Sequence, residues 1–268
     1  MARSFREPSV RLGTPTIVTA DAGCFYVSTP AAAGAGAAGG TGGTALASVI
    51  SPSDVVLAAT SPAGCLGVDV SSYQKWGLAE WQAAFAAGYR FAFIKACEGA
   101  SQDKRFAEHW AHAKAAGLLR GAYGFFHVTY ATQPQADALL DILAEHGAGE
   151  LPPVIDIEKA YGLTPSHITR DVAEWLDIVH QATEVRPIVY TYASFAKSKI
   201  IGAHLAESPL WVAHYGVAKP ADAPGWKRWD FWQFSGSGAI PGIRGKVDLN
   251  VYNGTLEELR DAYGVTTP

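Results

Sequence analysis

The stretch Val154-Ile155-Asp156-Ile157-Glu158 decides how this chain is expected to fold. Three β-branched apolar residues precede or separate two carboxylates, which predicts a buried strand over Val154–Glu158 that ends in a pair of acidic side chains. Because residues i and i+2 of a strand point to the same face, Asp156 and Glu158 are expected to project side by side. Such a pair can hold one carboxyl protonated and the other charged, which glycoside hydrolysis requires. A solvated strand end without a catalytic role is the alternative.

Around this stretch, apolar strand-like runs alternate with amphipathic helical runs from about Gly64 onward. The expected strands are Leu66–Val70, Phe91–Ala96, Arg120–Phe126, Val154–Glu158, Pro187–Tyr192, Leu210–His214, Phe231–Phe234 and Val247–Val251. The expected helices are Gly77–Ala87, Asp103–Ala116, Gln133–His146, Pro165–Thr183 and a short Ser194–Ile201. Repeated β-α units imply parallel strands joined by right-handed crossovers. The predicted fold class is therefore α/β, an irregular TIM-like barrel of about eight strands with five helices.

The first 60 residues differ from the rest of the chain. They contain three acidic and three basic residues, and Ala31–Ser48 consists mostly of Ala and Gly, a composition typical of a flexible linker. Short β-prone runs flank that tract. We therefore expect residues 1–60 to form an N-terminal arm with a Gly/Ala-rich linker, able to dock onto a partner, and residues 61–268 to form the barrel domain. An unstructured leader is the alternative.

Composition excludes several classes of protein. The chain has 268 residues, 49% of them hydrophobic, which is ample for the single core of an α/β barrel. The net charge of −4 gives no basic surface for nucleic acid. No apolar run approaches the ~18 residues that a membrane span requires. The N-terminus is a poor signal peptide, because Glu7 and Pro8 follow its two arginines and no apolar segment comes next.

Cysteine spacing predicts neither a metal site nor a disulfide framework. Cys24, Cys65 and Cys97 are odd in number and widely separated, and the last two are interpreted as small buried apolar residues. No cluster of His, Cys and carboxylates has the spacing of a zinc site, and no Gly-rich strand-turn-helix segment indicates a nucleotide. The sequence therefore predicts no metal and no cofactor.

In an α/β barrel the active site lies at the C-terminal ends of the strands. The candidates at those ends are Asp69, Lys95, Glu98, Tyr123, Phe125, Asp156, Glu158, Tyr190, Tyr192, Trp211, Tyr215, Trp232, Gln233, Asp248 and Asn250. Carboxylates and amides bind sugar hydroxyls, and aromatic faces stack on the C–H surfaces of pyranose rings, so this composition indicates a sugar-binding site.

Several of these candidates have other interpretations. Lys95 and Glu98 can form a structural ion pair at the rim of the barrel. Trp211 and Trp232 can be core residues. His127, which follows the third expected strand, is expected to be a hydrogen-bonded wall residue rather than an acid or base.

The order and spacing of several short segments carry a specific resemblance. These segments are Gly67–Gln74 (GVDVSSYQ), Phe93–Gly99 (FIKACEG), Gly121–Tyr123 (GAY), Asp156–Glu158 (DIE), Trp211–Tyr215 (WVAHY), Trp232–Gln233 (WQ), Pro241–Ile243 (PGI) and Val247–Asn250 (VDLN). In this order they resemble glycoside hydrolase family 25, the Chalaropsis-type lysozymes. The resemblance runs from about Gly64 to the C-terminus. It departs from the family pattern at Cys97, where a small hydroxyl residue is usual, and at Gly124, where a bulkier residue is common.

The resemblance implies N-acetylmuramidase activity, the cleavage of the β-1,4 bond between N-acetylmuramic acid and N-acetylglucosamine in bacterial peptidoglycan. Glu158 would be the general acid, and Asp156 would remain ionised. In the substrate-assisted scheme proposed for the family, the 2-acetamido group attacks the anomeric carbon while a carboxylate orients it. Either Asp156 or Asp248 could be that carboxylate or the nucleophile. Asp69 and Asp248 would hold the sugar, and the other candidates would bind substrate.

Two alternatives belong to other classes of function. One is a non-catalytic wall-binding or structural virion protein on the same barrel, which the four intact acidic residues argue against. The other is a hydrolase of other amino sugars, such as chitin. The enzyme is expected to act on the bacterial cell wall, and the poor signal peptide suggests release through a holin or delivery in a virion. The arm then suits docking onto a phage tail or another large assembly.

Overall fold

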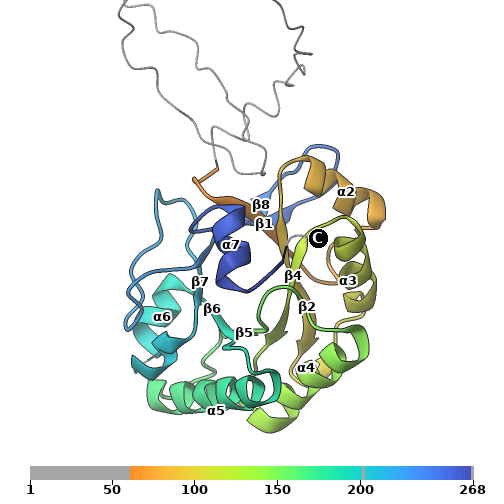
Figure 1. The fold of residues 1–268 in the computed structure, drawn as a ribbon. Helices are drawn as coiled ribbons and strands as arrows, with labels where there is room; N and C mark the ends of the chain where they lie inside the picture. Colours follow the sequence, from red (N-terminus) through yellow and green to blue (C-terminus); the bar gives the residue numbers. More distant parts are fainter. Residues whose placement is uncertain (1–60, 201–202, 267–268) are drawn as a thin grey trace, which may run out of the picture.

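The computed structural model describes residues 61–200 and 203–266, and the expected N-terminal arm lies outside the described residues. The described part is an α/β barrel with helices around its sheet (Figure 1). The barrel strands are β1 (Cys65–Val70), β2 (Phe91–Glu98), β4 (Leu119–Phe125), β5 (Val154–Asp156), β6 (Ile188–Tyr192), β7 (Leu210–Ala213), β8 (Phe231–Gly238) and β9 (Val247–Tyr252). They pair in this order, and β1 pairs with both β2 and β9, so the sheet closes. The short β3 (Ser101–Gln102) pairs with the end of β2.

Seven of the eight barrel strands are parallel, and β9 is not. It runs antiparallel to both β8 and β1. The parallel pairing that repeated β-α units imply ends at β8, because only eight residues (239–246) link β8 to β9. A parallel connection needs a crossover of about a dozen residues or more, whereas a short loop suffices for an antiparallel pair. Asp248, near the start of β9, consequently lies at the same end of the barrel as the C-terminal ends of its neighbours.

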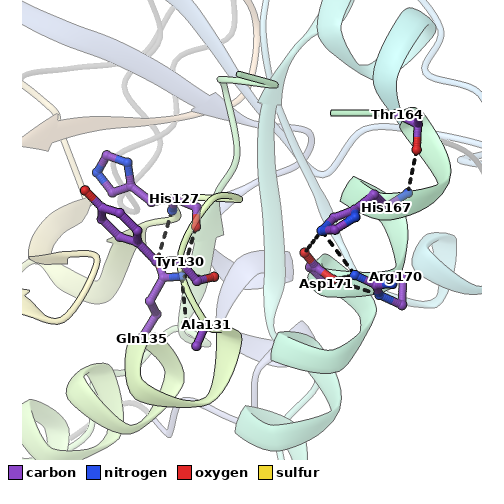
Figure 2. Close-up of polar contacts among 8 residues, drawn as sticks. All are labelled: His127, Tyr130, Ala131, Gln135, Thr164, His167, Arg170 and Asp171. Atoms are coloured by element: carbon purple, nitrogen blue, oxygen red, sulfur yellow. Dashed lines mark hydrogen bonds and ion pairs between the residues drawn. The ribbon is translucent and has the colours of Figure 1, made fainter. Parts of the chain in front are cut away.

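The five expected helices are confirmed as α2 (Leu78–Ala86), α3 (Phe106–Ala115), α4 (Thr132–His146), α5 (Pro165–Thr183) and α6 (Ala193–Lys199). Helix α5 has the expected bounds: Thr164 Oγ1 accepts a hydrogen bond from the His167 amide at 3.3 Å, and proline follows at the first helical position (Figure 2). A short 3₁₀ helix spans Ala203–Glu207. In the described residues, no helix is long and apolar enough to cross a membrane.

Helix α7 (Leu256–Ala262) was not expected. Its start is a capping box, in which Thr255 Oγ1 accepts from the Glu258 amide and the Glu258 carboxylate accepts from the Thr255 amide. Leu256 and Leu259 of this helix pack against residues at the N-terminal ends of the strands, such as Phe91. Helix α7 therefore fills the barrel at the end opposite the strand C-termini.

Alternation along the strands divides the apolar residues into two cores. The inner core includes Phe91, Phe93, Trp211 and Phe231, whose rings meet inside the barrel with centroids 4.3–5.6 Å apart. Gly67 makes room for this packing, since a Cβ there would lie 2.3 Å from the Phe91 ring. The outer core lies between the sheet and the helices. Aromatic rings therefore fill the interior of the barrel below the C-terminal ends of the strands.

Candidate active site

The inward positions at the strand C-termini carry acidic, amide and aromatic side chains. In register, Asp69 of β1 pairs with Asp248 of β9, and Gln233 of β8 pairs with Asn250 of β9. Asp156 ends β5 between Phe125 on β4 and Tyr190 on β6. Four separate parts of the sequence therefore contribute to one end of the barrel, which we call the mouth.

Asp69 is the most extensively hydrogen-bonded carboxyl group at the mouth. It is 6% exposed, and its Oδ2 accepts hydrogen bonds from Gln233 Nε2 at 2.7 Å and Asn250 Nδ2 at 2.8 Å. Burial raises the pKa of Asp69 well above its usual range, and the charge of Asp248 raises it further. Burial also raises the pKa of Asp248, with a further contribution from Glu158. The two carboxyl groups therefore share a proton at pH values where isolated aspartates have lost theirs.

An aromatic and amide network forms the floor of the mouth. Trp211 stacks on Phe93 with centroids 4.3 Å apart and donates from Nε1 to Asn250 Oδ1 at 2.8 Å. The Tyr190 hydroxyl donates to Gln233 Oε1 at 2.8 Å, and the same oxygen accepts from Tyr215. The oxygen of each amide that binds Asp69 thus accepts a hydrogen bond from a Tyr or Trp side chain. This bond orients the amide so that its nitrogen donates to the Asp69 carboxyl group.

Asp156 is also buried, with 6% of its surface exposed. Its Oδ1 is completely buried and has no hydrogen-bond partner among the described residues. Burial raises the pKa of Asp156 well above its usual range, Glu158 raises it further, and Lys95 opposes both. These contributions shift Asp156 toward its neutral form, whereas the resemblance implied that this residue stays ionised.

Glu158 lies just beyond the strand that was expected to contain it. Strand β5 ends at Asp156, although the Ile157 amide still donates to Tyr190 O at 3.0 Å. Ile157 belongs to the outer core, so alternation still directs Asp156 and Glu158 to the same side of the chain. Glu158 is half-buried and lies where two cavities meet.

We call these the inner and the outer cavity. The inner cavity, about 340 Å³, is lined by Glu158, Tyr190, Tyr192, Ala193, Ser194, Ala213, His214 and Tyr215. The outer cavity, about 420 Å³, is lined by Glu158, Lys159, Ala160, Tyr161, Tyr192, Ser194, Phe195, Ser198 and Lys199. Glu158, Tyr192 and Ser194 line both, so the two cavities adjoin each other at the acid.

Lys95 and Glu98 form the expected ion pair at the rim, with Nζ 2.5 Å from Oε2. A β-bulge between Lys95 and Cys97 shifts the register by one residue, which brings two side chains three positions apart to the same face. His127 Nε2 contacts Glu98 Oε1 at 3.3 Å, and its Nδ1 lies 3.5 Å from the Tyr161 hydroxyl. His127 is therefore a hydrogen-bonded wall residue, and the Lys95 contact lowers the pKa of Glu98.

The loop that carries His127 is held by one buried amide. Gln135 of α4 is 3% exposed, and its Oε1 accepts from the His127 amide at 2.9 Å. Its Nε2 donates to the carbonyls of His127, Tyr130 and Ala131 at 3.0–3.4 Å (Figure 2). Such multiple bonding to backbone fixes a loop that has no ladder partner. Gln135 was not among the sequence candidates, since nothing marks a helical glutamine as a loop anchor.

The comparison with protein-family models identifies the chain. Residues 68–243 match the model of glycosyl hydrolases family 25. The chain belongs to this family. It is 38% identical over 200 residues to the uncharacterized protein YegX of Escherichia coli, covering 72% of this chain and 71% of YegX. It is 34% identical over 227 residues to Lysozyme M1 of Streptomyces globisporus, covering 78% of this chain and 74% of that protein.

The fold agrees with solved family 25 structures. The bacterial lysozyme from Streptomyces coelicolor superposes with a TM-score of 0.68 and 32% identity, over 77% of this chain and all of that one. Membership confirms the resemblance inferred from the sequence segments, and it makes the chain a glycoside hydrolase. A purely structural role for the barrel is therefore not favoured.

The two departures from the family 25 pattern are neighbours in the sheet. Cys97 of β2 pairs with Gly124 of β4, and a Cβ added at Gly124 would lie 3.2 Å from the Cys97 sulfur. Sulfur is larger than a hydroxyl oxygen, so the small residue at 124 accommodates the larger one at 97. Both are buried, and neither contacts Asp69, Asp156 or Glu158 among the interactions described above.

Not every candidate faces the mouth. Trp232 lies on the outer face of β8, is 3% exposed in the outer core, and donates from Nε1 to His214 O at 2.9 Å. It is a core residue and contributes no surface to either cavity. Conversely, Lys159, Tyr161, Ser194 and Lys199 line the outer cavity without having been candidates. Lys159 and Tyr161 lie in the loop after β5 and Ser194 lies at the start of α6, which is where barrel enzymes commonly place their site residues, whereas Lys199 ends α6.

Proposed function

We propose that this family 25 glycoside hydrolase is an N-acetylmuramidase that cleaves the β-1,4 bond between N-acetylmuramic acid and N-acetylglucosamine with retention of configuration. The observation that supports it best is the Asp156/Glu158 pair, which combines a buried carboxyl group with a half-buried one beside two cavities. The name of Lysozyme M1, a relative with 34% identity, agrees with a peptidoglycan substrate.

Glu158 is the general acid of this mechanism. It lies between the cavities, where a glycosidic oxygen can reach it while a sugar occupies the inner cavity. It protonates the leaving oxygen as the bond breaks and then removes a proton from the incoming water, so one group serves both steps.

Asp156 is the partner of the substrate 2-acetamido group. Its Oδ1 is buried without a partner among the described residues, which is costly unless a donor arrives. The acetamido N–H is such a donor. Because donation to a carboxylate favours its charged form, substrate binding lowers the pKa of Asp156. The acetamido oxygen then attacks the anomeric carbon.

Asp69 and Asp248 hold the sugar and supply negative charge near the positive charge that develops at the anomeric carbon. Lys95, Glu98, Tyr123, Phe125, Tyr190, Tyr192, Trp211, Tyr215, Gln233 and Asn250 are the remaining substrate-binding residues of this proposal. Among them, Tyr190, Tyr192 and Tyr215 line the inner cavity and offer ring faces to a pyranose.

Mass spectrometry of digested cell walls tests the proposed bond specificity. Purified peptidoglycan treated with the enzyme should release muropeptides that end in reducing N-acetylmuramic acid. Products that end in reducing N-acetylglucosamine would identify a glucosaminidase instead. Cleavage of soluble chitin oligomers at a comparable rate would contradict the muramyl specificity.

Retention gives a second expected result. Attack by the acetamido group followed by water inverts the anomeric carbon twice, so the first product should carry a β-configured reducing end. Proton NMR on freshly cleaved substrate, recorded before mutarotation, distinguishes the two anomers. Initial release of the α anomer would overturn the acetamido mechanism, because inversion needs a water between carboxyl groups about 6.5–9.5 Å apart.

The phage-associated part of the proposal concerns residues 1–60. The enzyme is released through a holin or carried in a virion, and residues 1–60 dock it onto a phage tail or another large assembly. Every residue of the proposed mechanism lies after Gly64, so a chain of residues 61–268 should lyse walls at the rate of the full-length protein. The same truncation should abolish incorporation into particles, measured by co-sedimentation. Aggregation of the truncated protein, or loss of most of its activity, would show that the domain boundary is misplaced.

A further inference from the structure

The outer cavity carries positive charge that has no role in the proposed bond cleavage. Lys159, in the loop after β5, and Lys199, at the end of α6, both line it. Glu158 is the only acidic residue among the lining residues, so the two ammonium groups leave a net positive charge there. The neutral sugar backbone of the proposed substrate gives this positive charge no partner.

Neither lysine is neutralised by the protein. Within residues 61–200 and 203–266, the structure gives no ion pair to Lys159 or Lys199, although it pairs other rim cations such as Lys95. The Lys159 ammonium lies 5.3 Å from the centroid of the Phe125 ring, which holds it near the mouth without cancelling its charge. Unpaired ammonium groups are strong donors to anions, and the Ser194 hydroxyl offers a further polar contact.

The position of the outer cavity indicates how an anion would reach it. The cavity shares Glu158, Tyr192 and Ser194 with the inner cavity, and the loop after β5 and helix α6 supply the rest of its lining. A sugar held beside Glu158 in the inner cavity could therefore direct a branch on its own ring into the outer cavity. In peptidoglycan, the muramyl sugar carries such a branch, a lactyl group extended by a short peptide with free carboxylates.

We propose that the outer cavity binds the carboxylates of the peptide carried by the muramyl sugar, and that Lys159 and Lys199 make the enzyme selective for peptide-bearing glycan. This inference rests on the proposed muramidase function. The branch is tethered to the sugar at the cleaved bond, so its carboxylates reach the lysines at high effective concentration. An ion pair between a partly exposed lysine and a carboxylate adds only a modest amount to the binding free energy. Each binding event of a peptide-bearing strand nevertheless includes this contribution.

The test compares two forms of one substrate. Peptidoglycan glycan strands, stripped of phosphate-containing wall polymers, are used as isolated and after their peptide carboxyl groups have been converted to amides. The wild-type enzyme should cleave the charged form with a kcat/KM about three- to tenfold higher, a preference that shrinks with added salt. Lys159→Gln/Lys199→Gln should lose this preference while cleaving the amidated form at the wild-type rate.

Matched variants separate charge from structure. Lys159→Arg/Lys199→Arg keeps both charges and should keep the preference, and Lys197→Gln, on α6 but outside the cavity, should behave as wild type. Equal cleavage of both substrates by the wild type, or a preference that survives in the double glutamine variant, would overturn the assignment. So would equal losses on both substrates in that variant. If the wild type cleaves neither substrate, the muramidase proposal itself fails, which is a distinguishable result.

Discussion

Glu158→Gln is expected to reduce wall lysis by about 10²–10⁴-fold, because the amide keeps the size of the side chain but cannot deliver a proton to the leaving oxygen. The structure makes this substitution unusually clean. Glu158 is half-buried, and the described residues give its side chain no hydrogen bond or ion pair that glutamine would break. The free energy of unfolding should therefore change by less than about 0.5 kcal/mol.

Turbidity loss of cell-wall suspensions and thermal unfolding of the same preparations measure the two quantities. Glu145→Gln on α4, an exposed glutamate at 71% side-chain exposure, is the matched control and should leave both unchanged. A Glu158→Gln enzyme that keeps more than about a tenth of the wild-type rate would be incompatible with proton transfer by this residue. A large fall in thermal stability would instead indicate a structural role.

Short sequence patterns predicted much of the barrel. The alternation of side chains along a strand could also have removed Trp232 from the site candidates. The bounds of α5 follow from the Thr164–Pro165 start, and the two-residue spacing placed Asp156 and Glu158 on one side. Trp232 and Gln233 cannot lie on the same face of β8, because neighbouring side chains on a strand point in opposite directions. Gln233 binds Asp69, so Trp232 had to face the outer core.

Other features depend on the closed sheet and are absent from any local pattern. Asp248 reaches the mouth because β9 is antiparallel, and its pairing with Asp69 joins residues 179 positions apart. The Lys95–Glu98 pair depends on a bulge in β2, since unbulged strand residues three apart point to opposite faces. The outer cavity combines the loop after β5 with α6, two segments that sequence spacing alone does not bring together.

Asp69→Asn is expected to make the protein more stable and less active. Burial and Asp248 raise the folded-state pKa of Asp69 well above the ordinary value near 3.9. The folded state therefore keeps a proton that the unfolded chain loses, and the free energy of unfolding falls as the pH rises from the unfolded pKa toward the folded one. Asparagine resembles the neutral carboxyl group: its oxygen can accept from Gln233 and Asn250, and its amide can donate to Asp248.

The variant should thus gain about 1–2 kcal/mol in the free energy of unfolding near neutral pH, a few degrees in Tm, and the gain should vanish below about pH 4. Wall lysis should fall on the order of 10²-fold, because asparagine, unlike Asp69, cannot ionise when positive charge develops at the anomeric carbon. Asp141→Asn, an exposed aspartate of α4, should alter neither quantity. Thermal unfolding across the pH range measures the stability change, and lysis rates measure the activity change. Lower stability at neutral pH would show that Asp69 is held as a carboxylate by its two amides, and full activity would remove it from the mechanism.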